Sequence, residues 1–148
     1  IGAIRRRFPE AALRSSFIVG YPGETEDDHD ALLAFLRQAQ LDWAGFFAFS
    51  REDGTYAAGL PGQVPVWLVA ERTRECSEVQ DAITAERRAD LVGTKCRVLV
   101  DAPGRARSHR EAPDIDGIIQ APLDLRPGTW ADLEIVDAVG PDLVTAGA

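Results

Sequence analysis

The sequence predicts an α/β domain followed by an all-β one. Segments of strand and helix character alternate over residues 1–62, a helical stretch follows, and beyond Gly93 the apolar residues recur at every second position. With 148 residues and 45% apolar composition, the chain is long enough to bury two small cores. We therefore expect α/β architecture in the first half and a small β-barrel in the second.

The first half is predicted to form helix, strand, helix and strand in that order. Residues 1–8 have the character of a helix end, and the mostly apolar, partly β-branched run at 13–19 is typical of a buried strand. Thr25 followed by Asp28 is the pattern of a capping box at a helix start. A second strand is expected at 43–49, and the order strand, helix, strand predicts a parallel pair. The predicted buried stripe of the helix between them is Leu32, Leu33, Leu36 and Ala39.

The second half changes its periodicity. Residues 50–65 are rich in Gly, Pro and Ala and predict a loop, whereas residues 66–90 carry apolar side chains near helical spacing and predict one long or broken helix. Cys96, Val98 and Val100 then alternate with their neighbours, as in a half-buried strand. Further short strands are expected at 117–121, 130–138 and 143–146. About five short strands in so few residues predict a small closed barrel.

Charge and cysteine content narrow the function classes. The net charge of −8 divides into −5 over residues 1–90 and −3 over residues 91–148, which argues against tight, sequence-independent binding to nucleic acid. No apolar run is long enough to cross a membrane and no leader is evident, so we expect a cytoplasmic protein. Cys76 and Cys96 have no Cys or His at metal-ligand spacing and are predicted to be buried thiols. Since residue 1 is not Met, the chain is expected to begin inside a larger protein.

Three motifs carry a family resemblance. The first, at 13–25, is Leu-Arg-Ser-Ser-Phe-Ile-Val-Gly-Tyr-Pro-Gly-Glu-Thr, and the second, at 49–58, holds Phe-Ser, Gly-Thr and Ala-Ala pairs. The third is Arg-Ser at 107–108 followed by Ala-Pro-Asp-Ile-Asp-Gly at 112–117. In order and spacing these motifs resemble those of the radical-SAM methylthiotransferases, and the third resembles their terminal TRAM domain. It is similar to the RimO-type members, which act on a ribosomal protein, rather than to the MiaB-type members, which act on tRNA.

The resemblance implies a fold and a reaction. Residues 1–62 would be the carboxy-terminal part of a radical-SAM barrel, 63–90 connecting helices, and 91–148 a five-stranded, OB-like TRAM barrel that binds the substrate. The whole enzyme would add a methylthio group to the β-carbon of an aspartate in small-subunit ribosomal protein twelve, using S-adenosylmethionine and two 4Fe-4S clusters. The cluster cysteines of the family have no counterpart in this sequence. The catalytic residues therefore stay unassigned, and the chain is expected to be inactive by itself.

The resemblance also points to candidate contact residues. Ile18 and Gly20 end the first predicted strand, and Phe49 and Ser50 end the second, where the matching strands of the family line the cofactor cleft. An ordinary turn after a buried strand would explain the first pair equally well. The candidates for substrate binding lie around the third motif, on a predicted exposed loop: Arg105, Arg107, His109, Arg110, Asp114 and Asp116. Their partner would be the ribosomal protein or the small subunit, with RNA contact open and no membrane involved.

Other conspicuous residues have ordinary explanations. The acidic residues at 24–28 are attributed to the positive end of a helix rather than to a metal or acid–base site. Ser50, Arg51 and Thr55 lie on a loop after a strand, where contact with a ligand is plausible. The aromatics Trp67 and Trp130 are predicted to pack in cores rather than to stack on bases. Two further hypotheses remain open: a tRNA (adenosine) methylthiotransferase of MiaB type, and a non-catalytic module that binds RNA or protein.

Overall fold

The computed structural model describes all residues, 1–148, and divides them into two compact units. Residues 13–80 form one, here called the α/β unit, and residues 1–12 with 81–148 form the other, the barrel unit. None of the helices is both long and apolar enough to cross a membrane.

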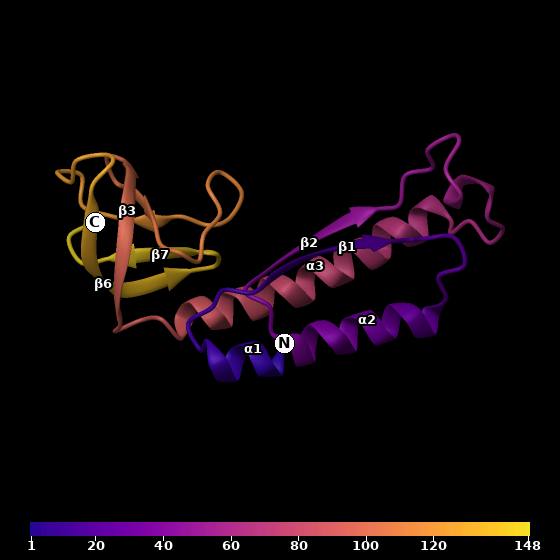
Figure 1. Cartoon of the computed structure of the whole chain (residues 1–148), viewed down its shortest axis with the longest axis horizontal. Helices are drawn as coiled ribbons and strands as arrows, with labels where there is room; N and C mark the ends of the chain where they lie inside the picture. The colour runs from indigo at the N-terminus through magenta and orange to yellow at the C-terminus, as the bar shows by residue number, and fades with distance from the viewer. The chain divides into compact units, whose positions relative to one another are not determined.

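The α/β unit is built on two parallel strands. These are β1 (Arg14–Val19) and β2 (Trp43–Ala48), paired in register from Arg14 opposite Trp43 to Val19 opposite Ala48. Between them runs α2 (Glu26–Ala39), and the long helix α3 (Val66–Ala89) follows a loop that contains a short 3-10 turn at Ala57–Gly59. Figure 1 shows α2 and α3 running alongside the two strands. The predicted parallel strand–helix–strand unit and the long helix, which is unbroken, are both confirmed.

Local sequence explains where α2 begins and ends. The Thr25 hydroxyl accepts a hydrogen bond from the Asp28 amide, and the Asp28 carboxylate accepts one from the Thr25 amide, so the predicted capping box is present. Gln40 ends the helix in the left-handed conformation, with a φ of 49°. Leu36 and Ala39 of the predicted stripe are buried, while Leu32 and Leu33 are half-buried. Helix α2 thus packs one apolar face and leaves its acidic first turn exposed.

One face of the two-stranded sheet packs against helix and the other is open. Phe17 of β1 stacks on Phe46 of β2 at 5.6 Å between ring centroids and meets Phe35 of α2 edge-on at 6.1 Å. On the opposite face, Ile18 is 61% exposed and Phe47 is 59% exposed. The alternation of strand side chains thus divides aromatic residues between a packed face and an apolar open face.

The barrel unit closes five strands on themselves in the order β3-β4-β5-β7-β6. The pairing of β5 with β7 is parallel and the other four pairings are antiparallel. The bounds are β3 (Lys95–Ala102), β4 (Arg105–Arg107), β5 (Ile119–Gln120), β6 (Trp130–Val139) and β7 (Asp142–Thr145). The unit also contains α1 (Gly2–Arg7), at the predicted first helix, and the last turns of α3. The predicted five-stranded barrel is confirmed.

The core of the barrel is a cluster of apolar side chains, beside which the Thr145 side chain of β7 is also buried. Val98 and Val100 face inward with at most 1% exposure, as their alternation predicted. Closure removes the free strand edges that would otherwise invite pairing with another chain. The buried core cluster is Val98, Ala106, Ile119, Ala121, Ile135 and Leu143.

Three sequence predictions are wrong. Residues 105–107 form strand β4 rather than part of an exposed loop, because Ala106 packs in the core with 1% exposure between two paired arginines. Trp67 and Trp130 are 68% and 59% exposed rather than buried, because each lies at an outer position near the start of its helix or strand. The Trp130 ring instead carries the Arg97 guanidinium at 5.3 Å from its centroid.

Candidate functional site

A cleft of about 420 Å³ opens at the carboxyl ends of β1 and β2. Gly20 follows β1, Phe49 and Ser50 follow β2, and α3 supplies Val69. Ligands of α/β proteins commonly bind at this end of parallel strands. The complete lining is Gly20, Ala48, Phe49, Ser50, Arg51, Gln63, Val64, Val66, Val69 and Ala70.

The lining is mostly apolar, with few polar groups. The Ser50 hydroxyl donates to Glu52 at 2.8 Å, and the Gln63 amide donates to the carbonyl of Leu60 at 3.1 Å. Arg51 is the one charged residue of the lining. An apolar cleft of this size with a few polar groups at one end is typical of small-molecule sites.

Gly20 shapes the inner wall of the cleft. Its φ is +81°, a conformation that side chains other than glycine rarely adopt. A Cβ atom there would lie 2.3 Å from Cγ2 of Val69, so the Val69 side chain of α3 occupies the space that a side chain at Gly20 would need. Its amide donates a hydrogen bond of 2.8 Å to Oε2 of Glu24. Both its conformation and its packing therefore require glycine.

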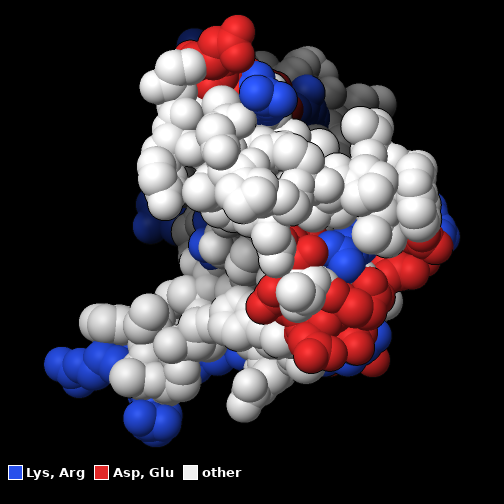
Figure 2. Space-filling model, turned by 90° about the vertical axis from the view of Figure 1, so that its right-hand side faces the viewer, with Lys and Arg blue, Asp and Glu red and all other residues white.

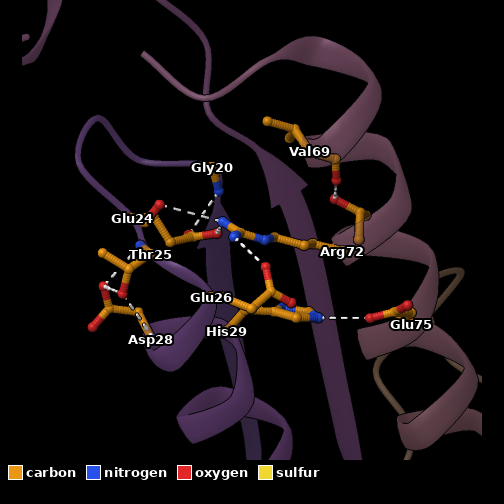
Figure 3. Close-up of polar contacts among 10 residues, drawn as sticks. Gly20, Glu24, Thr25, Glu26, Asp28, His29, Val69, Arg72 and Glu75 are labelled. Carbon is orange, nitrogen blue, oxygen red and sulfur yellow. Dashed lines mark hydrogen bonds and ion pairs between the residues drawn. The ribbon is translucent and has the colours of Figure 1, made fainter. Parts of the chain in front are cut away.

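An ion-pair network around the buried Arg72 lies beside Gly20 (Figure 3). Nη1 of Arg72 donates to Oε1 of Glu24 at 2.7 Å, and Nη2 donates to Oε2 of Glu26 at 2.9 Å. The Arg72 side chain is 4% exposed and that of Glu24 is 13% exposed. Close by, Nε2 of His29 lies 2.7 Å from Oε2 of Glu75. The network joins the turn after β1, the start of α2 and one face of α3.

The network changes the acidity of its members. Burial acts to lower the pKa of Arg72, but its hydrogen bonds to Glu26 and Glu24 and their negative charges outweigh burial and raise it. The hydrogen bond from Arg72 lowers the pKa of Glu26. The pKa of Asp28 is lowered by the hydrogen bonds from the amide and hydroxyl of Thr25. The pKa shifts of Arg72, Glu26 and Asp28 all favour the ionised form of the group.

These contacts refine the prediction for the acidic residues at 24–28. Asp28 serves the helix start as predicted, but Glu24 and Glu26 pair with Arg72 of a distant helix. No group of three or more His, Cys, Asp and Glu side chains is placed to hold a metal ion. Figure 2 looks onto this end of the chain and shows acidic side chains gathered in a patch below a broad uncharged surface.

The four predicted cofactor contacts are not all in one place. Gly20, Phe49 and Ser50 line the cleft together, as does Arg51. Ile18 is not part of the lining and lies on the open face of the sheet. Thr55 lies farther along the loop, where its hydroxyl donates to the carbonyl of Glu52.

The predicted substrate contacts lie in the barrel unit, and their arginines are paired with acidic groups. Arg105 pairs with Asp114 at 2.9 Å, and Arg107 lies 3.6 Å from Asp101. Asp116 accepts a hydrogen bond of 2.6 Å from the amide of Ala112. Residues around this loop enclose a cavity of only about 10 Å³, which is room for one water molecule. This cavity is too small for a ligand larger than water.

The remaining two candidates hold a different segment of the barrel unit. Arg110 pairs with the Glu10 carboxylate at 2.7 Å, and its side chain is 11% exposed. His109 lies 2.9 Å from the carbonyl oxygen of the same residue. Both therefore attach the segment after α1 to the barrel.

Sequence reasoning missed Arg72, Arg88 and Glu111. Arg88 forms a buried ion pair with Glu111, whose other oxygen accepts from the amide and hydroxyl of Ser108. A signal was present on α3, because Arg72 falls at helical spacing between the buried Val69 and Cys76. An arginine within an apolar stripe needs a buried partner.

The two cysteines are free and differ in burial. Cys76 is buried, as predicted, and Cys96 is half-buried. Burial, with the charges of Glu24 and Glu75, raises the pKa of Cys76 to about 11. Burial also raises the pKa of Cys96. Neither thiol has the low pKa of a reactive cysteine.

Comparison with known proteins assigns the family. No family model matches the chain. It is 44% identical over 95% of its length to the ribosomal protein uS12 methylthiotransferase RimO of Akkermansia muciniphila. The protein of the same name from Moorella thermoacetica is 45% identical over 86% of the chain, and that from Cutibacterium acnes is 40% identical over the whole chain. The chain belongs to the RimO family, as a carboxy-terminal part.

The match to the RimO family covers nearly all of this chain but only part of each relative. The chain spans about a third of the length of the curated relatives it matches, namely 31%, 29% and 32% of the three proteins. The fold agrees with this assignment, since a closed five-stranded barrel follows a parallel strand–helix–strand unit.

Proposed function

We propose that this chain forms the cofactor cleft and the substrate-binding barrel of a radical-SAM methylthiotransferase that modifies an aspartate of ribosomal protein uS12. The observation that carries the proposal is the cleft itself. Gly20, Phe49 and Ser50 meet at the carboxyl ends of two parallel strands in a chain 44% identical to a uS12 methylthiotransferase. In this assignment residues 1–62 contribute to the radical-SAM barrel, 63–90 connect, and 91–148 are the TRAM domain.

The cleft suits an adenosyl group. Its walls are apolar where Phe49, Val64 and Val69 lie, and the absence of a side chain at Gly20 lets a flat ring approach the backbone. Arg51 offers a cation to a carboxylate, which both S-adenosylmethionine and the aspartate substrate carry. When bound, S-adenosylmethionine supplies the radical that removes hydrogen from the aspartate β-carbon. The residues of this chain bind and orient it.

The residues of this chain do not fit an iron–sulfur cluster. Its two cysteines lie in different units, and no three potential ligands come together. Each 4Fe-4S cluster of the family requires cysteine thiolates. We assign the clusters to residues outside this sequence and derive no step through them.

The barrel unit is assigned to substrate binding. Its charged loop and its net negative charge favour a basic protein such as a ribosomal protein, in the cytoplasm. RNA contact is a second candidate for the same unit. It is favoured by the exposed Trp130 ring, which bears the Arg97 guanidinium, because exposed aromatic rings stack on bases.

The test uses the protein that carries this chain, purified without oxygen and with its clusters reconstituted. It is incubated with S-adenosylmethionine and either uS12 or tRNA, and each product is analysed by mass spectrometry. The proposal predicts one methylthio group on an aspartate of uS12. Methylthio transfer to tRNA, or to neither acceptor, would overturn it.

A further inference from the structure

Helix α3 acts on the Gly20 turn through two residues one helical turn apart. Val69 fills the space that a side chain at Gly20 would occupy, and Arg72 binds the carboxylate that holds the Gly20 amide. Figure 3 shows both side chains directed from α3 towards the turn after β1. The position of Gly20 is therefore set from α3 by packing and by charge.

Glu24 is the link between Arg72 and Gly20. One of its oxygens accepts from Arg72 at 2.7 Å, and the other accepts from the Gly20 amide at 2.8 Å. Since the Arg72 side chain is only 4% exposed, its charge requires these partners. Its Nε has no hydrogen-bond partner, so the two carboxylates of Glu24 and Glu26 provide nearly all of its compensation. Loss of Glu24 would therefore release the turn and disturb the guanidinium together.

We propose that Glu24 and Arg72 are a positioning pair that fixes the inner wall of the cofactor cleft by holding Gly20. The choice of S-adenosylmethionine as ligand rests on the proposed function, whereas the coupling of Gly20 to Arg72 does not. Because the Gly20 amide is already bonded to Glu24, a ligand contacts Gly20 at its Cα and carbonyl only. This wall thus recognises a ligand by shape rather than by hydrogen bonding to that amide.

The experiment uses ¹⁵N-labelled protein carrying this chain and the variants E24Q, R72M and E24Q/R72M. The matched control is R74M, which breaks the exposed Arg74–Glu78 pair on the same helix, with side chains 60% and 62% exposed. Two quantities are measured: amide hydrogen exchange at Gly20 and the dissociation constant of S-adenosylmethionine itself. Amides of the barrel strands report on folding of the other unit.

Each single variant is expected to exchange the Gly20 amide at least about tenfold faster and to bind S-adenosylmethionine at least about tenfold more weakly, because a buried charge loses its partner. In both quantities the double variant should change no more than the single variant with the larger change, since the two residues act through one another. R74M should match the wild type in both quantities. A general loss of stability would instead make the effects of the two single variants multiply, and it would speed up hydrogen exchange at the amides of the barrel strands.

The outcomes separate the two proposals. Unchanged Gly20 exchange in E24Q, or effects that multiply in the double variant, would overturn the positioning pair. If R72M does not fold, E24Q decides alone. If the variants exchange the Gly20 amide faster but the wild type itself does not bind S-adenosylmethionine, the positioning pair is supported and the proposed function is contradicted.

Discussion

The two units bury charge in different surroundings. In the α/β unit, Glu24 of the Glu24–Arg72 pair binds the amide of Gly20, which lines a cleft of about 420 Å³. In the barrel unit, Glu111 of the buried Arg88–Glu111 pair lines a cavity of about 10 Å³. The first pair thus supports the wall of a cleft that is large enough for a small molecule, and the second borders room for one water molecule. This difference supports our proposal that the α/β unit binds the small molecule and the barrel unit binds the substrate.

The sheets of the two units also differ in how much apolar surface they expose. The two-stranded sheet leaves Ile18 and Phe47 exposed on an apolar face, whereas the barrel is closed around an apolar core. Two strands alone are marginally stable, and packing against α2 and α3 supplies the rest. We therefore expect the barrel unit to depend on its core and its one buried ion pair, and the α/β unit on its helices.

Breaking the Arg88–Glu111 pair should have the largest effect. The variant R88M leaves Glu111 buried with 1% side-chain exposure, which should destabilise the barrel unit by about 3–5 kcal/mol. Denaturant unfolding measures the loss of stability. The rate at which a thiol reagent labels Cys96 shows whether the barrel unit is the part that opens. The control is R105M, whose exposed pair with Asp114 should contribute at most about 1 kcal/mol. Equal effects of the two variants would contradict the account.

An alanine substituted for glycine should cause a clash in each unit, but only one of the two clashes can be relieved by a second substitution. In G117A the new Cβ would lie 2.1 Å from the backbone carbonyl oxygen of Pro141, and in G20A 2.3 Å from a side-chain carbon of Val69. Each should cost about 1–3 kcal/mol or more, with G117A the larger because backbone cannot move aside. Adding V69A should restore part of the stability of G20A. No rescue in that double variant, measured by thermal unfolding, would show that packing is not the main cause.

The pH dependence of stability should carry a term from the α/β unit. The pKa of Cys76 is raised to about 11 in the folded state, so the neutral thiol stabilises the fold at pH values below its ordinary 9.0. This contribution is lost as the pH rises from about 9 to about 11, by an amount on the order of 2 kcal/mol. Unfolding free energies of wild type and C76A across this range measure it. Parallel pH curves for the two proteins would refute the prediction.

The cap of α2 should make a smaller contribution. T25A removes the hydroxyl that accepts from the Asp28 amide, which should cost about 1 kcal/mol. Because the pKa of Asp28 is lowered, the carboxylate half of the cap is present at neutral pH and is lost as the pH falls through that lowered value. Urea unfolding at neutral and acidic pH measures both. A T25A effect that stays constant down to acidic pH would argue against the coupling.

The smallest effect on stability should come from Trp130. Since its side chain is exposed at the start of β6, W130A should change the free energy of unfolding by less than about 0.5 kcal/mol. Binding of uS12 or RNA to the barrel, measured by titration, is the sensitive readout. Loss of affinity for one of them, with stability unchanged, would identify which partner uses this face.

Periodic and local features could be predicted from the sequence. The alternation at Cys96, Val98 and Val100 gave the first barrel strand, and Thr25 with Asp28 gave the start of α2, because both signals lie within a few residues. The strand Arg105–Arg107 could not be found in this way. It has three residues and one apolar side chain, and its pairing with β3 and β5 is what defines it.

The ion pairs of the site could not be predicted, because they join residues far apart in the chain. Arg72 and Glu24 are 48 positions apart, and Arg88 and Glu111 are 23 apart. The position of Arg72 in the apolar stripe of α3 was a signal that the sequence analysis did not use, and it would not have told which acid pairs with the arginine. Exposure of Trp67 and Trp130 likewise depends on which side of an element faces solvent near its first residues.

The most direct test of the division between the units is a titration of the ¹⁵N-labelled protein with S-adenosylmethionine. The account predicts that the amide signals of Gly20, Phe49, Ser50 and Arg51 shift, and that those of the barrel strands do not. Shifts confined to the barrel unit, or no shifts at all, would contradict it.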